Sequence, residues 1–191
     1  MSAETAPVAP AAPPMSLGRR RLVLSALLLA TVLASLDSSF VPIAFPDIID
    51  KLDTSTSVVV WVALGYLISA TGLMLLSSRL SAFLGSDRVF QLGVFIYSMA
   101  MIACTWAPDI QTLIALRVIQ GAGMALFLPI TFSLAAELYS PAERTKALSM
   151  LASSFGVGTV IGPATAHYFL FPPFGLAGPL IMFAAFGVAV L

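Results

Sequence analysis

The chain has 191 residues, of which 59% are hydrophobic and only 9% are charged. Soluble domains average about 45–50% apolar and about 25% charged residues, so this chain cannot cover a water-facing surface and must face lipid. Its nine basic and nine acidic residues cancel, which argues against nucleic acid as a partner. Cys104 is the single cysteine, which excludes a disulfide framework or a cysteine metal cluster and favours a small buried residue.

The first 18 residues are rich in proline and alanine, and we expect them to be a disordered cytoplasmic leader. A secretory signal peptide is not expected. The basic cluster at residues 19–21 is followed by an apolar run of membrane-spanning length, without a short apolar core and a small-residue cleavage site.

The rest of the chain consists of long apolar runs separated by short polar linkers. Spanning the hydrocarbon takes about 20 apolar residues, and backbone in lipid must satisfy its own hydrogen bonds, so these runs are expected to be helices. We therefore predict an all-α membrane protein in which residues 19–191 form one six-helix bundle; a buried soluble bundle is the disfavoured alternative. The predicted spans are 22–45, 58–80, 89–106, 110–138, 147–171 and 174–191.

Basic residues are distributed unevenly between the two sides of these spans. Seven of the nine lie in three segments that alternate with the rest: Arg19–Arg21, Arg79 with Arg88, and Arg144 with Lys146. The opposite side holds Lys51, which three aspartates outnumber. Because cytoplasmic loops carry the excess of Lys and Arg, we expect a multi-pass protein of the cell (inner) membrane with both termini in the cytoplasm.

Two charges fall deep inside predicted spans, away from the ends of the spans. Asp37 lies about 12 Å from the outer end of the first span, and Arg117 lies about 10 Å from the same side in the fourth. Each costs about 2.5–3.5 kcal/mol near a helix centre. Their similar depth is compatible with a direct pair or with two charges lining one polar cavity. Arg117 is also long enough to snorkel to the interface, whereas Asp37 is not.

Prolines and small residues interrupt three spans. Pro42 and Pro46 follow Asp37 and make the end of that span polar and deformable. The fourth span contains Gln120, Gly121 and Gly123, and the fifth contains Ser154, Gly158 and Gly162 at four-residue spacing, followed by Pro163. Such spacing lets two helices approach closely, and Pro163 adds a bend that could act as a hinge.

The sequence gives little support for a dinucleotide site, a histidine proton relay or an enzyme active site. The segment GVGTVIG lacks the spacing, the preceding strand and the acidic residue of a dinucleotide site. His167 is the one histidine, and an interfacial position is favoured over a proton relay. We identify no nucleophile–base pair and no metal site, so an enzyme is not expected.

These motifs resemble the N-terminal half of a major facilitator superfamily transporter, closest to the drug–proton antiporters with fourteen spans. The first-helix signature of that branch matches Leu36, Asp37, Ser39, Val41, Ala44 and Pro46. Ser39 replaces its threonine, and Pro42 replaces its asparagine. The fourth-helix signature matches Leu113, Arg117, Gln120, Gly121, Gly123 and Ala125. The antiporter signature matches Gly158, Gly162 and Pro163, with Ala166 and His167 in place of a closing glycine pair.

The loop between the second and third spans departs from the family pattern. Leu80 and Gly85 are kept, but Ser78, Ala82 and Phe83 stand at the Gly, Asp and Arg positions. The family aspartate is thought to clasp the other half of the transporter, and Asp87 with Arg88 could partly substitute. Such transporters also rock two bundles about a midplane site, and this chain supplies one.

The resemblance implies export of small, amphipathic compounds by proton antiport, driven by the proton motive force without a cofactor. Asp37 would accept the proton, Arg117 would tune the proton affinity of Asp37, and Gln120 would add a polar contact. The helix contact formed by Gly158, Gly162 and Pro163 would bend and would control leak. The expected partners are membrane lipid, a small-molecule substrate, and either a C-terminal half or a second copy. The alternative is a truncated or non-transporting membrane interaction module.

Overall fold

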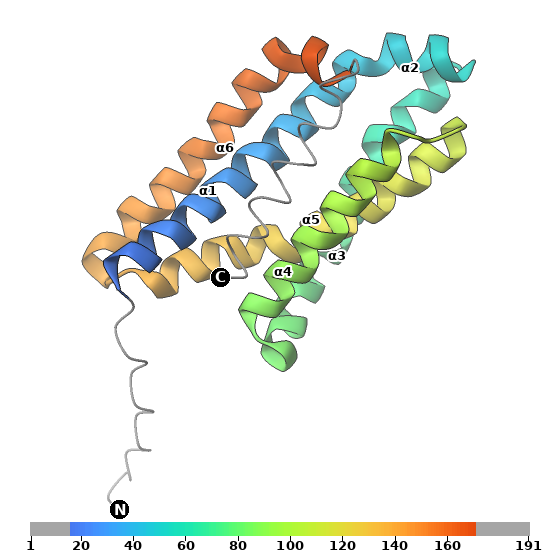
Figure 1. Ribbon diagram of the computed structural model, residues 1–191. Helices are drawn as coiled ribbons and strands as arrows, with labels where there is room; N and C mark the ends of the chain where they lie inside the picture. Colours follow the sequence, from blue (N-terminus) through green and yellow to red (C-terminus); the bar gives the residue numbers. More distant parts are fainter. Residues whose placement is uncertain (1–15, 171–191) are drawn as a thin grey trace, which may run out of the picture.

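The computed structural model describes residues 16–170, apart from the side chains of Phe40 and of residues 165–170. This part of the chain is helical (Figure 1). Its elements are α1 (Leu17–Phe40), the 3-10 turn η1 (Val41–Ala44), α2 (Phe45–Leu52), α3 (Thr56–Leu84), α4 (Ser86–Cys104), α5 (Ile110–Leu138) and α6 (Pro141–Leu170). With α1, η1 and α2 taken as one run, five segments are long and apolar enough to cross a membrane.

The described helices correspond to the first five predicted spans, and most are longer at their ends. The fourth span matches α5 at both ends, whereas α6 begins at Pro141, six residues before the apolar run. A helix continues into the polar interface where hydropathy no longer marks it, and proline is well tolerated in a first turn. The predicted sixth span, 174–191, lies outside the described residues, as do residues 1–15. α1 begins at Leu17, inside the segment predicted to be a leader, with Ser16 as its N-cap.

The first predicted span, 22–45, does not remain a single α-helix to its last residues. α1 stops at Phe40, Pro42 lies in η1, and Pro46 lies in the first turn of α2. Proline has no N–H to donate and clashes with the preceding turn, so the α-helix gives way to a 3-10 turn. The apolar side of α2 then packs over the N-terminal ends of α3 and α5, against Val59, Val62 and Leu113.

The long helices pack as two groups around one apolar core. α5 lies along both α3 and α4, while α1 lies along α6 (Figure 1). The core draws buried side chains from all five of these helices, including Leu27, Tyr66, Val94, Phe127 and Leu151. α3 and α4 are joined by Gly85, whose φ of 88° is readily available only to glycine and lets the chain reverse in one residue.

Glycines allow close crossings of α5 with its neighbours. A Cβ on Gly123 would lie 2.6 Å from the backbone nitrogen of Tyr97, and one on Gly93 would lie 2.7 Å from that of Phe127, so α4 and α5 touch backbone to backbone. Gly121 meets the backbone of α3 at Tyr66 in the same way. Small residues are the usual means by which membrane helices approach this closely.

The same packing joins α6 to α1. Gly158 lies directly against the carbonyl of Val32 and the hydroxyl of Ser35, and a Cβ on Gly162 would lie 2.9 Å from the carbonyl of Leu36. The small residues recognised in the sequence at four-residue spacing are thus in a helix contact. Pro163 lies inside α6 on an exposed face.

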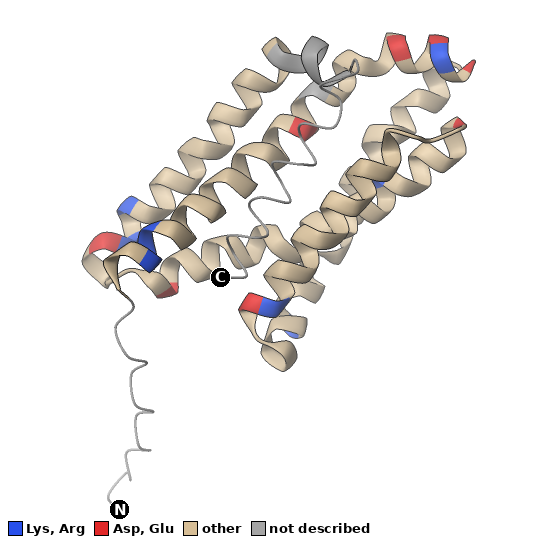
Figure 2. Ribbon diagram, in the orientation of Figure 1, with Lys and Arg blue, Asp and Glu red and all other residues tan. Residues whose placement is uncertain are grey.

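Charged residues gather at the two ends of the helices (Figure 2). At the end that holds α2, Asp109 is the N-cap of α5 and accepts a hydrogen bond from the backbone N–H of Thr112 at 2.8 Å. That bond, with one from the Thr112 hydroxyl, lowers the pKa of Asp109 below its ordinary value.

The Gly158 contact predicts the effect of adding a single methyl group. Gly158→Ala should destabilise the bundle by about 1–3 kcal/mol, because overpacking forces α1 and α6 apart. Gly156 is the matched control on the same helix, since nothing lies within 4 Å of an added Cβ there. Thermal unfolding of the two purified variants in detergent compares them, and equal midpoints would show that α1 and α6 do not meet at Gly158.

Candidate functional site

A carboxylate is buried near the middle of the bundle. Asp37 lies one turn before the end of α1, and its exposed fraction is 0%. An ionised carboxylate without partners is strongly disfavoured in such a place. The neighbouring helices must therefore supply charge and hydrogen-bond donors.

Three side chains from α4 and α5 supply the charge and the hydrogen-bond donors that Asp37 requires. Arg117 donates from Nη1 to both oxygens of Asp37, at 3.0 Å to Oδ1 and 3.1 Å to Oδ2. On the next turn of α5, Gln120 donates from Nε2 to Oδ2 at 3.0 Å. From α4, the hydroxyl of Tyr97 donates to Oδ2 at 2.9 Å. The carboxylate thus receives hydrogen bonds from one cationic and two neutral donors.

The similar depth of Asp37 and Arg117 was compatible with a direct pair, with two charges lining one cavity, or with an Arg117 that snorkels. The structure shows the direct pair. Arg117 is 8% exposed and paired with Asp37, so it does not snorkel to the interface. Within the described residues, Asp37 is enclosed by these partners and does not face an open cavity. Gln120 is part of the same cluster, bonded directly to the carboxylate.

Tyr97 was not predicted as a site residue from the sequence. It lies in an apolar run, seven residues before the end of α4, or about 10 Å along the helix axis. That depth matches those of Asp37 and Arg117, so a search for hydrogen-bonding side chains at equal depth would have found it. Depth alone does not show which way a side chain points, and the direction comes from the packing of α4 on α5.

Several buried polar atoms near this cluster have no hydrogen-bond partner in the described part of the chain. They include Nε of Arg117, Oε1 of Gln120 and the hydroxyl oxygen of Ser98. An unpartnered buried acceptor such as Oε1 is costly. Because the Gln120 amide offers both a donor and an acceptor, it can bond either an ionised or a protonated Asp37.

The end of the bundle at which α1 and α6 begin carries a second ion pair. Arg20 of α1 donates to Glu143 of α6 at 2.6 Å, and its guanidinium lies 3.7 Å from the ring centre of Tyr139. Arg144 donates to the backbone carbonyl of Ala136 at 2.9 Å. These exposed contacts connect α1, α5 and α6 at the opposite end from Asp37.

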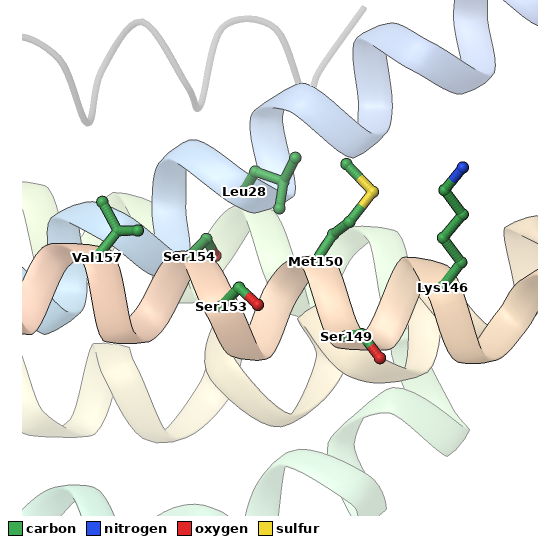
Figure 3. Close-up of a pocket in the computed structure, with 7 residues that line it drawn as sticks. All are labelled: Leu28, Lys146, Ser149, Met150, Ser153, Ser154 and Val157. Atoms are coloured by element: carbon green, nitrogen blue, oxygen red, sulfur yellow. The ribbon is translucent and has the colours of Figure 1, made fainter.

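An open groove of about 450 Å³ runs along α6 (Figure 3). Its lining is formed by Leu28 of α1 and by Lys146, Ser149, Met150, Ser153, Ser154 and Val157 of α6. Leu28 precedes Asp37 by more than two turns of α1, so this groove is separate from the buried carboxylate.

The other residues singled out in the sequence do not join the Asp37 cluster. Ser78, Ala82 and Phe83 lie in the last turns of α3, where Phe83 is exposed, and Asp87 lies in the first turn of α4. The side chain of His167 lies outside the described residues. In the described part of the chain, no group of three or more His, Cys, Asp or Glu residues could hold a metal ion.

Known proteins match this chain over most of its length. Residues 27–191 match the model of the Major Facilitator Superfamily. A methylenomycin A resistance protein of Streptomyces coelicolor is 34% identical over 144 residues, which cover 73% of this chain and 30% of that protein. A probable actinorhodin transporter of the same organism is 30% identical over 158 residues, or 83% of this chain and 27% of its own length.

A third relative is the multidrug transporter protein MdtP of Bacillus subtilis, 28% identical over 145 residues, which cover 76% of this chain and 27% of MdtP. The matched part of the chain therefore spans less than a third of each of these relatives. The family match, the apolar helices and the motifs around Asp37 and Arg117 agree, and the chain belongs to the major facilitator superfamily.

Proposed function

We propose that this chain forms the N-terminal bundle of a secondary active exporter, which moves small amphipathic compounds out of the cell in exchange for protons. The observation that carries the proposal is the buried carboxylate of Asp37, held by Arg117, Gln120 and Tyr97. Ionisable residues within a membrane usually mark ion or substrate pathways. The names of the relatives, for resistance to or transport of small compounds, support an export function.

The proposed mechanism begins with Asp37 ionised and bound to Arg117. A proton entering from the outer side neutralises the carboxylate, which removes the attraction to Arg117 and leaves the new O–H in need of an acceptor. Rotation of the Gln120 amide would present Oε1, which has no partner among the described residues. Release of the proton to the cytoplasm restores the ion pair, and the two states of the cluster would bias the bundle between its two orientations.

The proposed transporter needs a second bundle, because transporters of this kind hold their substrate near the midplane between two repeats. A C-terminal half of the same protein or a second copy of this chain would supply it. The α6 groove favours such a partner, since Ser149 and Ser153 place small polar side chains along it (Figure 3). Residues of that kind promote contact between membrane helices.

The alternative is a membrane interaction module that does not transport by itself. Dye efflux driven by a proton gradient in vesicles that hold this chain alone separates the two functions. Efflux supports a transporter assembled from copies of the chain, and its absence leaves the module or a bundle that needs a different second half.

The central substitution is Asp37→Asn in the complete transporter. It should abolish efflux driven by a proton gradient, because an amide cannot take up and release the coupled proton. Asp50→Asn is the matched control, since Asp50 is exposed in α2 at the outer end. Efflux rates at equal protein levels measure the effect, and unchanged efflux by Asp37→Asn would remove this carboxylate from the mechanism.

We further propose that the end of the bundle rich in Arg and Lys faces the cytoplasm, in the cell membrane, with both termini on that side. In a Cys104→Ala background, Ser55→Cys should react with an impermeant maleimide on intact cells, whereas Ala142→Cys should react only after the membrane is opened. Both positions are exposed, between α2 and α3 and in the first turn of α6. The reverse pattern of labelling would invert the topology.

A further inference from the structure

We propose that Tyr97 is a positioning residue: its hydroxyl holds one oxygen of Asp37 and thereby sets the pH at which that carboxyl takes up a proton. This inference rests on the proposed proton coupling at Asp37. It concerns a residue of α4 to which the sequence motifs gave no role.

The position of the Tyr97 hydroxyl is fixed by packing on α5. Tyr97 is fully buried, and its ring meets that of Phe127 edge to face, with centroids 5.5 Å apart. Its backbone nitrogen lies at the α4–α5 crossing, 2.6 Å from where a Cβ on Gly123 would be. A buried ring that packs on Phe127, from a backbone fixed at this crossing, delivers its hydroxyl to one place, and that place is Oδ2 of Asp37 at 2.9 Å.

The bond also connects two helices that do not lie along each other. α1 makes its long contact with α6, and α4 makes its long contact with α5. The Tyr97 hydroxyl reaches Asp37 across this arrangement and fixes the direction of Oδ2, to which Gln120 also donates. Positioning of the carboxylate thus depends on α4 as well as on α5.

A hydroxyl that donates to a carboxylate stabilises its ionised form. Tyr97 and Gln120 do this without adding charge, whereas Arg117 contributes a full positive charge. Loss of the Tyr97 hydroxyl therefore makes ionisation of Asp37 less favourable while leaving the ion pair in place. Protonation of Asp37 should then occur at higher pH.

Other titratable groups near Asp37 would remain unchanged by that loss. Besides Arg117 on α5, they are Tyr66 on α3 and Cys104 at the end of α4. The charged side chains in the described part of α6 are Glu143, Arg144 and Lys146, which lie in its first two turns at the far end. The remaining titratable group of α6, His167, has its side chain outside the described residues.

An infrared titration of the purified protein tests the proposal without measuring transport. The C=O band of protonated Asp37 is identified by its loss in Asp37→Asn and is followed against pH. Tyr97→Phe keeps the ring against Phe127 and removes only the hydroxyl. A hydrogen bond to a charged group changes an equilibrium constant by about tenfold or more. Loss of the Tyr97 hydroxyl should therefore move the midpoint of the Asp37 titration upward by about one pH unit.

Tyr66→Phe is the matched control. Tyr66 is also buried and its side chain lies beside that of Tyr97, but its hydroxyl donates to the sulfur of Met124 and not to Asp37. It should move the midpoint by less than half as much, and the fluorescence of Trp61 and Trp106 verifies that both variants are folded. A titrating Asp37 band that Tyr97→Phe leaves in place, or that Tyr66→Phe moves equally, overturns the role of Tyr97. An Asp37 band that never appears while the protein stays folded contradicts proton uptake at Asp37 and with it both proposals.

Discussion

The ion pair between Asp37 and Arg117 is the interaction on which the rest of the site depends. Each charge alone is unfavourable inside the bundle, and the attraction between the two offsets the desolvation cost of both. Its presence requires α1 and α5 to meet at one depth, and it explains why Gln120 and Tyr97 point to the same place. The cost of removing a carboxylate from water is offset by four hydrogen bonds and one opposite charge.

The backbone contacts around the cluster make this geometry possible. Gly121 and Gly123 allow α5 to lie close to α3 and α4, and Gly158 allows α6 to lie close to α1. Closer backbones bring short side chains such as Asp37 within reach of their partners. The glycines of the sequence motifs and the polar residues of the site thus belong to one arrangement, in which packing determines the positions of the charges.

Much of this could be predicted from the sequence, and the remainder could not, for identifiable reasons. Apolar runs located five helices because a span must be long and uncharged, and depth along those runs placed Asp37 level with Arg117. Depth is one coordinate, so it did not distinguish a pair from a shared cavity, and it gave no reason to select Tyr97 from an apolar run. The break of the first span at Pro42 was expected only as a bend, because a single proline does not show whether an α-helix resumes in the same direction.

The enclosed cluster is suited to a protein that changes between two states, since a buried pair that loses one charge must rearrange. The stability of this cluster therefore depends on the energetic coupling of Asp37 to Arg117, which a double-mutant cycle of Asp37→Asn and Arg117→Gln measures directly in the unfolding free energy. For residues in direct contact, we expect a coupling of at least about 1 kcal/mol, with the double variant more stable than the sum of the single effects implies. Additive effects, with coupling near zero, would contradict it, because the two charges would then not support each other in the folded bundle.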